Sequence, residues 1–562
     1  MEILEVPFPA LGKGQVWVRN HFSVVSAGTE SKTVTDARKG YIAKARSRQK
    51  EVRQVLDLIR TQGLAEAYRL VMNKLEAPSP LGYSCAGEVI ATGEGVTDLK
   101  PGDFVACGGQ GAYHAGVVAV NRNLCVKVPD GVDLRQAAFA TIAAIAFQGI
   151  RQADVQPGGN CVVIGLGLIG QLTLQLLDAS GVKAIGVDID PAQVEFVTRH
   201  ASRVTSFLRT QEGLEQIILD RTAGHGTDAV IITAATASTD PVDLAGTLCR
   251  KKGKVVIVGA VPTGFSRENY YKKELDLRMS SSYGPGRYDP VYEEKGTDYP
   301  IGYVRWTENR NMMAFTDLLA AGKLRIEDLI THTFSLEDAP QAYEMILEKK
   351  EHFVGILIRY NTEVNLREST SQQVNTSTGS APLSPPLLRE KGPGVEAAVG
   401  FIGAGNFAQN MLLPRLKGRC RFVGVATAQG NESLYVGRKY GFAYATGDAE
   451  KIFADPDINT VFIVTRHDLH ANFVIKALQA GKNVFVEKPL AMTMEELEKI
   501  REVYTSPPSP PLHRERGPGG QVMVGFNRRF APPVREIMRL LPPSVPRAVM
   551  IRVNAGILPK EH

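Results

Sequence analysis

The chain has 562 residues, of which 44% are hydrophobic and 22% charged. This length exceeds what one hydrophobic core usually serves, so several domains are expected, and the composition excludes a globally disordered protein. The net charge of +6 is spread thinly along the chain. The most basic stretch, residues 37–54, is interpreted as a solvated helix face, with a patch for an anionic ligand as the alternative; no nucleic-acid partner follows from it.

The N-terminal segment lacks the basic and apolar regions of a signal peptide, and no stretch of ~18 uninterrupted apolar residues follows it. A cytoplasmic location without membrane insertion is therefore predicted. The six cysteines form no CxxC pair and no cluster. Neither a structural zinc nor a disulfide framework is expected, and the cysteines are interpreted as small buried residues.

Two patterns divide the first part of the chain. In residues 1–130, short β-branched runs alternate with Gly, Pro and Asp, which predicts a β-barrel-like domain, interrupted by a helical stretch from about 31 to 76. In residues 131–265, apolar strands alternate with segments of helix length. That alternation predicts a parallel sheet covered on both faces.

Residues 361–396 are polar and rich in Ser, Thr, Asn and Pro. Such a segment cannot build a core, so a disordered linker is predicted. A second series of apolar strands and helix-length segments occupies residues 397–505, which predicts another doubly wound sheet.

A short internal repeat stands apart from these domains. "SPPLLREKGPG" at 384–394 recurs as "SPPLHRERGPG" at 509–519. Because its Pro and Gly content forbids regular structure, both copies are interpreted as exposed insertions, the second filling residues 506–520. A proline-rich docking motif is the alternative.

The stretch "NCVVIGLGLIGQLTLQLL" at 160–177 predicts a strand, a glycine turn and a helix. Gly165 permits the turn, Gly167 lets a pyrophosphate approach the backbone, and Gly170 lets helix and strand pack closely. Asp188 ends the next predicted strand, where a carboxylate binds ribose hydroxyls and repels a 2′-phosphate. This favours NAD over NADP at the first site.

A second turn of the same kind follows at "AAVGFIGAGNFAQN", residues 397–410, where Gly403, Gly405 and Ala408 give GxGxxA. Thr427 stands where the ribose-binding acid is expected. The hydroxyls of Thr427 and Ser433 are then candidates for accommodating a phosphate. The cofactor at the second site is predicted to be NAD or NADP, without a choice between them.

The first 360 residues resemble the medium-chain dehydrogenase/reductase superfamily of the zinc alcohol dehydrogenase type. The resemblance implies a GroES-like barrel, a Rossmann domain inserted in it, and a return segment over residues 266–360. "SAGTE" places Ala27 at the family's zinc-binding cysteine, and "LGYSCAGEV" places Tyr83 at its histidine.

An alanine offers zinc no lone pair, so this half is predicted to lack the catalytic metal. Its substrate would then be polarised by hydrogen-bond donors such as Tyr83, Ser26 or Thr29. Roles in barrel packing and turns are the alternative for these three residues.

Residues from 397 onward resemble the Gfo/Idh/MocA family of glucose-fructose oxidoreductase and inositol dehydrogenase type. "VEKPLAM" matches the family's Glu-Lys-Pro box, with Glu487, Lys488 and Pro489. The resemblance implies that Lys488 lies near the nicotinamide and exchanges a proton with the reacting hydroxyl.

Two further motifs carry this resemblance. "TRHDLH" supplies Thr465 and His470 but departs from the family in its central pair, and "VGFNRRF" places Arg528 toward cofactor and substrate. Residues 521–562 are expected to begin a truncated α+β substrate domain, because the family continues for roughly a further small domain beyond this point. The second active site is therefore expected to be incomplete.

Together the halves resemble bi-domain oxidoreductases of bacterial surface-polysaccharide and sugar metabolism. The fold class expected is α/β multidomain, with a GroES-like β-barrel and two Rossmann domains. The resemblance implies hydride transfer on a sugar or nucleotide-sugar alcohol or carbonyl, and a homo-oligomer is compatible with it. The alternative is a nucleotide-binding or scaffold protein, derived from such an enzyme, that does not turn over.

Overall fold

The structure is a computed structural model. It describes residues 1–38, 55, 59–60, 63–200, 203–363, 371–374, 397–505 and 520–526. Residues 39–54 of the basic stretch 37–54 and 506–519 of the insertion 506–520 therefore lie outside the described residues. The same holds for residues 527–562 of the expected substrate domain, which include Arg528. Within the described part, no helix is long and apolar enough to cross a membrane.

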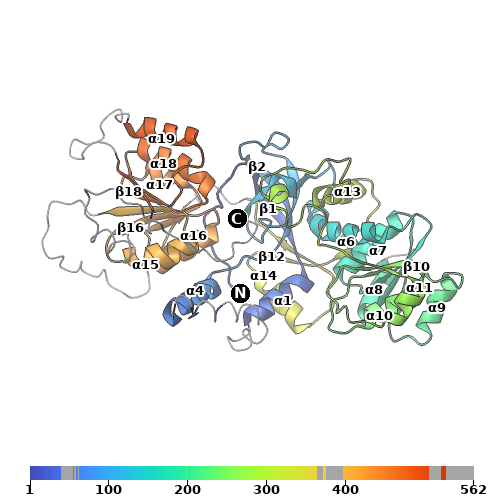
Figure 1. Cartoon of the computed structure of the whole chain (residues 1–562). Helices are drawn as coiled ribbons and strands as arrows, with labels where there is room; N and C mark the ends of the chain where they lie inside the picture. The colour runs from blue at the N-terminus through green and yellow to red at the C-terminus, as the bar shows by residue number, and fades with distance from the viewer. Residues whose placement is uncertain are drawn as a thin grey trace, which may run out of the picture. The chain divides into compact units, whose positions relative to one another are not determined.

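The first sheet is the barrel-like layer of the N-terminal half (Figure 1). Strands from both ends of this half meet in it, because Ser23 in β1 pairs antiparallel with Ile358 in β13. The return segment therefore contributes strands to the same sheet as β1. The strands run in the order β12 (Ile330–Ser335), β13 (Gly355–Arg359), β1 (Gln15–Val25), β2 (Ser84–Thr92), β3 (Phe104–Gly108) and β5 (Cys125–Lys127), with β4 (Val117–Asn121) paired to β1.

The second sheet is a parallel Rossmann sheet. The first strand in the sequence, β6, lies in the middle of the sheet, between β7 and β9. This is the doubly wound arrangement, with its switch point between β6 and β9. The strands in spatial order are β11 (Asp276–Met279), β10 (Cys249–Ile257), β9 (Thr227–Ile232), β6 (Asn160–Ile164), β7 (Lys183–Asp188) and β8 (Thr205–Leu208).

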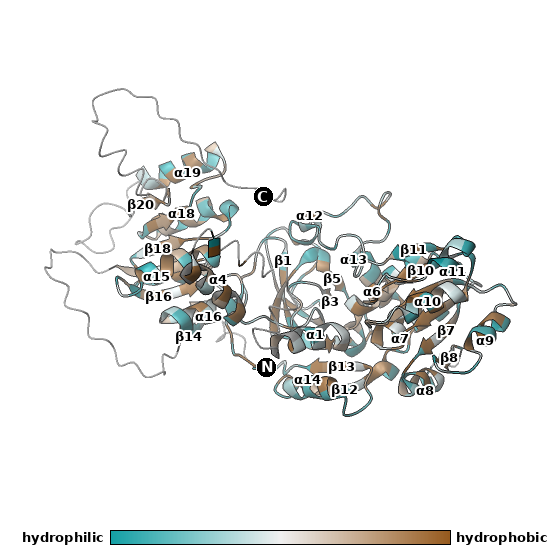
Figure 2. Cartoon of the chain, turned by 60° about the horizontal axis from the view of Figure 1, so that its bottom comes forward, coloured by the Kyte–Doolittle hydropathy of each residue, from teal (hydrophilic) through white to brown (hydrophobic). Residues whose placement is uncertain are grey.

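Side chains of β6 alternate between the two faces of this sheet, as they must in a strand. Val162 and Ile164 belong to one core cluster, and Cys161 and Val163 to another. Figure 2 shows these apolar strands between helices whose outer faces are more polar. The first cluster includes residues of α9 (Leu214–Arg221), α10 (Asp240–Leu248) and α11 (Arg267–Lys273), and the second includes residues of α7 (Leu168–Ala179) and α8 (Pro191–His200).

The N-terminal half contains further helices. The helix expected from about 31 to 76 corresponds in the structure to two described helices, α1 (Ala27–Arg38) and α4 (Leu64–Glu76). The remaining helices are α5 (Leu134–Ala137), α6 (Ala140–Ala153), α12 (Pro290–Glu293), α13 (Glu308–Ala320) and α14 (Ala339–Glu348), with 3₁₀ turns η1 (Arg122–Leu124) and η2 (Glu327–Leu329).

The third sheet repeats the Rossmann order in the C-terminal half. Its first strand, β15, lies between β16 and β18, as β6 lies between β7 and β9. The spatial order is β14 (Ser371–Gln373), β17 (Tyr444–Thr446), β16 (Arg421–Ala426), β15 (Ala398–Ile402), β18 (Thr460–Ile463), β19 (Asn483–Val486) and β20 (Val522–Val524). The elements between them are η4 (Ala408–Leu412), α15 (Leu413–Leu416), α16 (Gly430–Tyr440), α17 (Ala449–Ala454), η5 (His467–Leu469), α18 (His470–Gln479) and α19 (Met494–Thr505).

Two boundaries differ from the prediction. Strand β11 is the sixth strand of the Rossmann sheet, so this domain runs past residue 265 into the segment assigned to the return. Within the predicted linker 361–396, β14 pairs antiparallel with β17, and Val374 is only 7% exposed. Polar composition did not prevent this strand, because pairing at a sheet edge uses main-chain groups.

Glu308 is a fully buried acid at the start of α13. Its side chain is 0% exposed, and neither carboxyl oxygen has a hydrogen-bond partner in the described part of the chain. Burial, and then the charge of Glu293, raise the pKa of Glu308 from 4.5 to about 9, although Arg287 opposes the shift. The folded protein therefore holds this carboxyl in its neutral form at pH 7.

Glu308→Gln is expected to stabilise the N-terminal half increasingly as the pH rises from 5 toward 9. In this window the folded wild type binds more protons than the unfolded chain, so its free energy of unfolding falls with rising pH. Glutamine has no proton to lose, and the gain at pH 7 should be about 1–3 kcal/mol. Denaturant unfolding at several pH values, followed by tryptophan fluorescence, measures it.

Tryptophan emission reports on this half because Trp17 and Trp306, the two tryptophans of the chain, both lie in it. Glu337→Gln, at an exposed position, is the control and should leave the pH dependence unchanged. Parallel stability curves for wild type and Glu308→Gln would contradict the prediction.

Candidate dinucleotide sites and active site

The first glycine turn follows β6 at the switch point of the second sheet. Gly165 has φ of +98°, and a Cβ there would lie 2.6 Å from the amide nitrogen of Ala234. A Cβ at Gly170 would lie 2.0 Å from the carbonyl oxygen of Gly165. Gly167 faces open space. A side chain at the first or third glycine would thus collide with the backbone, while the second leaves space beside it. Their role in holding a pyrophosphate stays a prediction.

Asp188 lies at the end of β7, directly beside this turn. Its carboxylate accepts hydrogen bonds from the Leu166 amide at 2.5 Å and the Asp190 amide at 2.8 Å. The acid is therefore held next to the glycine turn, at the place where ribose hydroxyls are bound in dinucleotide sites of this fold.

The second turn has the same construction after β15. Gly403 has φ of +83°, and a Cβ there would lie 2.4 Å from the carbonyl oxygen of Val464. Gly405 faces open space, and Ala408 is fully buried. The chain continues from Ala408 in the short π-helical turn η4 before α15 begins.

One buried glutamine follows each turn. Gln171 Nε2 donates to the carbonyl of Leu166 at 3.0 Å, and Gln409 Nε2 donates to that of Ala404 at 2.8 Å. In both turns the acceptor is the residue between the first two glycines. Both glutamines are present in the quoted motifs, but the sequence analysis gave them no role. The pattern of glycines does not indicate that a side chain bonds back to the turn.

Thr427 and Ser433, candidates for a phosphate contact at the second site, are both buried. The hydroxyl of Thr427 donates to the carbonyl of Gln429 at 2.7 Å, and that of Ser433 donates to Gly430 at 2.9 Å. Their protons are thus used within the loop, and these hydroxyls give no support for preferring NADP.

His470 joins two of the predicted motifs of the third sheet. This fully buried ring places Nδ1 2.7 Å from the carbonyl oxygen of Pro489 and Nε2 3.1 Å from that of Thr465. Lys488 is exposed at the end of β19. Burial raises the pKa of the neighbouring Glu487, while its main-chain contact with Lys488 opposes the shift. Thr465, His470 and the Glu-Lys-Pro box therefore meet at the same sheet edge as Gly403.

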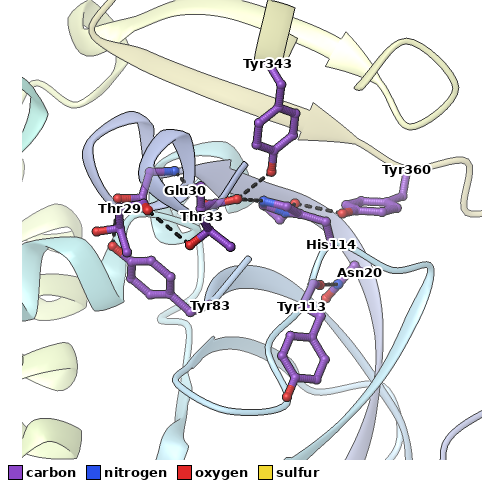
Figure 3. A network of polar contacts seen from close by, with 11 residues as sticks. Asn20, Thr29, Glu30, Thr33, Tyr83, Tyr113, His114, Tyr343 and Tyr360 are labelled. Atoms are coloured by element: carbon purple, nitrogen blue, oxygen red, sulfur yellow. Dashed lines mark hydrogen bonds and ion pairs between the residues drawn. The ribbon is translucent and has the colours of Figure 1, made fainter. Parts of the chain in front are cut away.

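Tyr83 lies in a hydrogen-bonded group of the barrel half (Figure 3). Its hydroxyl donates to Ser26 Oγ at 2.8 Å and also contacts the Thr29 side chain. Burial raises the pKa of Tyr83, so the hydroxyl keeps its proton at neutral pH. The structure thus brings together the three donors named from the sequence.

Next to them lies a buried carboxylate, Glu30. It accepts hydrogen bonds from the Ser26 amide at 2.8 Å, from His114 Nε2 at 3.1 Å and from the hydroxyl of Tyr343 (Figure 3). Burial alone raises the pKa of Glu30, but the charge and hydrogen bond of His114, with the other donors, bring it below its usual range. Glu30 belongs to the quoted "SAGTE" motif, yet no sequence signal pointed to His114 or Tyr343 as its partners.

The loop carrying His114 also holds the main chain around Tyr83. The Gly109 amide donates to the carbonyl of Tyr83 at 3.0 Å, and the His114 amide donates to that of Leu81 at 2.8 Å. A Cβ on Gly82 would lie 2.7 Å from His114 Nδ1. Tyr83 is therefore fixed from both its hydroxyl end and its backbone.

Three family models match the chain. "Alcohol dehydrogenase GroES-like domain" covers residues 56–134, "Zinc-binding dehydrogenase" covers 169–294, and "Oxidoreductase family, NAD-binding Rossmann fold" (Gfo/Idh/MocA) covers 397–506. The chain fuses a zinc-type alcohol dehydrogenase half to a Gfo/Idh/MocA oxidoreductase domain. Both of its Rossmann domains are thus matched by models of oxidoreductase families.

The dehydrogenase half has similar proteins of known name. D-xylulose reductase A of Aspergillus oryzae is 27% identical over 305 residues, covering 48% of this chain and 77% of that protein. D-guloside 3-dehydrogenase of Escherichia coli is 28% identical over 273 residues, covering 48% and 74%.

Solved structures were also compared with the chain. Alcohol dehydrogenase TADH from Thermus sp. ATN1 has a TM-score of 0.46 at 22% identity, covering 64% of this chain and 96% of that one. Galactitol-1-phosphate dehydrogenase from Escherichia coli has a TM-score of 0.47 at 18% identity, with the same coverage.

The residues at the zinc positions of the dehydrogenase half do not fit the metal. Ala27 has no lone pair to offer, and the hydroxyl of Tyr83 keeps its proton and is bonded to Ser26. Among the described residues, no group of three or more His, Cys, Asp or Glu is arranged to hold a metal ion. The absence of zinc stays a prediction, which rests on this donor set.

Asp188→Ala is expected to weaken NADH binding to the first site about 10- to 100-fold, because the ribose loses a charged hydrogen-bond acceptor. Discrimination against NADPH should fall at the same time. Fluorescence titration with NADH and NADPH measures both effects.

The matched control is Asp178→Ala, which removes a carboxylate from α7 away from the turn. It should bind NADH as the wild type does. Unchanged NADH affinity in Asp188→Ala would contradict the assignment of this site.

Proposed function

We propose that the chain is an NAD(P)-dependent oxidoreductase that transfers hydride on a CH–OH or carbonyl group of a sugar or nucleotide sugar. The observation that carries the proposal is the pair of glycine turns, each at the switch point of its own Rossmann sheet. The names of the similar proteins, a xylulose reductase and a guloside dehydrogenase, support a carbohydrate or polyol substrate. We further propose a cytoplasmic role in bacterial surface-polysaccharide or sugar metabolism.

NAD is the cofactor proposed for the first site. The glycine turn would hold its pyrophosphate and Asp188 its ribose, and the bound nicotinamide supplies or accepts the hydride. In carbonyl reduction, Tyr83 donates its proton to the substrate oxygen as the hydride reaches the carbon. Its raised pKa keeps the hydroxyl protonated at neutral pH, and the hydrogen bonds with Ser26 and Thr29 hold it in place until the substrate oxygen replaces Ser26 as acceptor.

NAD or NADP is proposed for the second site. There Lys488 would exchange a proton with the reacting hydroxyl, in agreement with its exposed position at the end of β19. His470 orients this region by joining Pro489 to Thr465. The contribution of Arg528 lies outside the described residues and stays a prediction, as does the incompleteness of this site.

The rival proposal is a protein that binds dinucleotide at both turns without turnover. It is favoured by the poor fit of zinc to Ala27 and Tyr83. The enzyme is favoured by the ordered Tyr83 hydroxyl and by the Glu-Lys-Pro box. Turnover of any member of a panel of sugars and nucleotide sugars, read as a change in NADH absorbance, separates the two.

Tyr83→Phe is expected to lower kcat of the dehydrogenase half about 10²- to 10⁴-fold, because the proton donor is lost while the ring is kept. NADH binding should remain within about twofold, since Tyr83 is not part of the glycine turn. Steady-state kinetics on any substrate found in the panel measure the effect. Tyr113→Phe, in the neighbouring loop, is the control, and equal activity of both variants would remove Tyr83 from the mechanism.

Lys488→Ala is expected to abolish turnover at the second site, by about 10²-fold or more, and to leave turnover at the first site unchanged. The two halves can be distinguished because Tyr83→Phe should lower turnover at the first site and leave turnover at the second site unchanged. Lys499→Ala, on the outer surface of α19, controls for the loss of a positive charge. If substrates are found and Lys488→Ala affects none of them, the C-terminal domain only binds its cofactor.

A further inference from the structure

Trp306 stands between two arginines, just before α13. The guanidinium carbon of Arg151 lies 3.3 Å from the centre of the indole, and that of Arg305 lies 3.8 Å from it. Two guanidinium groups this close to one ring centre cannot share a face without overlapping. They therefore cover opposite faces of the indole, and its edge is the part that neither guanidinium covers.

Arg151 is fixed in this position from its other sides as well. It lies in the last turn of α6, its guanidinium carbon is 5.0 Å from the ring centre of Phe147, and its Nε donates to Asn311 Oδ1 at 2.7 Å. Asn311 is itself anchored, since its Nδ2 donates to the carbonyl of Tyr283 at 3.0 Å. In the described part of the chain, the two Nη atoms of Arg151 have no hydrogen-bond partner.

Arg151 and Arg305 are two like charges without a balancing acid among the described residues. Two arginines of the same segment have acidic partners, Arg287 with Glu293 and Arg310 with Asp298. Within the described residues, no carboxylate pairs with Arg151 or Arg305. Burial and the charge of Arg305 lower the pKa of Arg151 to about 10, which is the expected effect of a like charge held nearby.

We propose that Arg151, Trp306 and Arg305 form a binding site for a phosphate-type anion at the indole edge. A guanidinium is planar and offers paired N–H donors, which match the oxygens of phosphate, and two of them match its double charge. The indole faces are already covered, so a nucleobase has no ring to stack on. The ligand class is inorganic phosphate, pyrophosphate or the diphosphate of an activated metabolite, and the proposal does not depend on the oxidoreductase activity.

The chain provides its own reporter for a test. It has two tryptophans, so Trp17→Phe leaves Trp306 as the single indole. In this background, pyrophosphate is titrated at constant ionic strength, with calorimetry as the second measurement. We expect a saturable change in Trp306 emission, and affinity at least about tenfold weaker in Arg151→Gln and in Arg305→Gln.

Controls separate the site from general charge effects. Arg267→Gln, which removes an arginine 4.2 Å from the ring of Tyr271, should retain the wild-type affinity. Arg305 is exposed, so its variant should fold even where Arg151→Gln does not. Uridine, which lacks phosphate, should cause no change.

Two probes identify the source of the anion. Equal binding of pyrophosphate and uridine diphosphate supports a site for phosphate alone, and tighter binding of uridine diphosphate supports an activated metabolite. No saturable change with either probe up to ~10 mM overturns the proposal, as does equal affinity of the wild type and both arginine variants.

Discussion

Both halves of the chain depend on close contact between backbone atoms where a strand turns into a helix. At Gly170 a methyl group would lie 2.0 Å from the carbonyl of Gly165, and at Gly403 it would lie 2.4 Å from that of Val464. A side chain at Gly170 would push α7 away from the turn after β6, and one at Gly403 would collide with the backbone that follows β18. The free amides of the helix would then no longer face the position of a pyrophosphate. The shape of both turns therefore depends on the absence of a Cβ atom at these glycines, and not on a side chain that would contact a ligand.

The same turns were predictable from the sequence because their evidence is local. Strand, glycines and helix lie within a single stretch of the chain, and Asp188 follows at the end of the next strand. The order of both Rossmann sheets agrees with the alternation of apolar strands and helices. The edges of the domains were less predictable: β14 forms inside a polar segment because β17 offers it an unpaired edge, and no composition rule reports that edge.

The polar contacts around Tyr83 show where local evidence ends. Glu30 is 84 positions from His114 and 313 from Tyr343. Nothing in the motif "SAGTE" specifies partners at such distances, so the sequence indicated the hydroxyls of Ser26, Thr29 and Tyr83 but not the carboxylate behind them. Glu308 and the stack around Trp306 were missed for the same reason, since burial and stacking are properties of the assembled fold.

These contacts also explain how the barrel half keeps a carboxylate buried beside the Tyr83 hydroxyl. An ionised carboxylate is costly in the protein interior unless charge and hydrogen bonds compensate it. Glu30 accepts hydrogen bonds from an amide, an imidazole and a phenol, and these donors stabilise its negative charge. Ser26 takes part in both contacts, because its amide donates to Glu30 and its hydroxyl accepts from Tyr83. One residue therefore helps to stabilise the charge of Glu30 and to orient Tyr83. A residue change that moves the Ser26 backbone would therefore disturb both Glu30 and Tyr83.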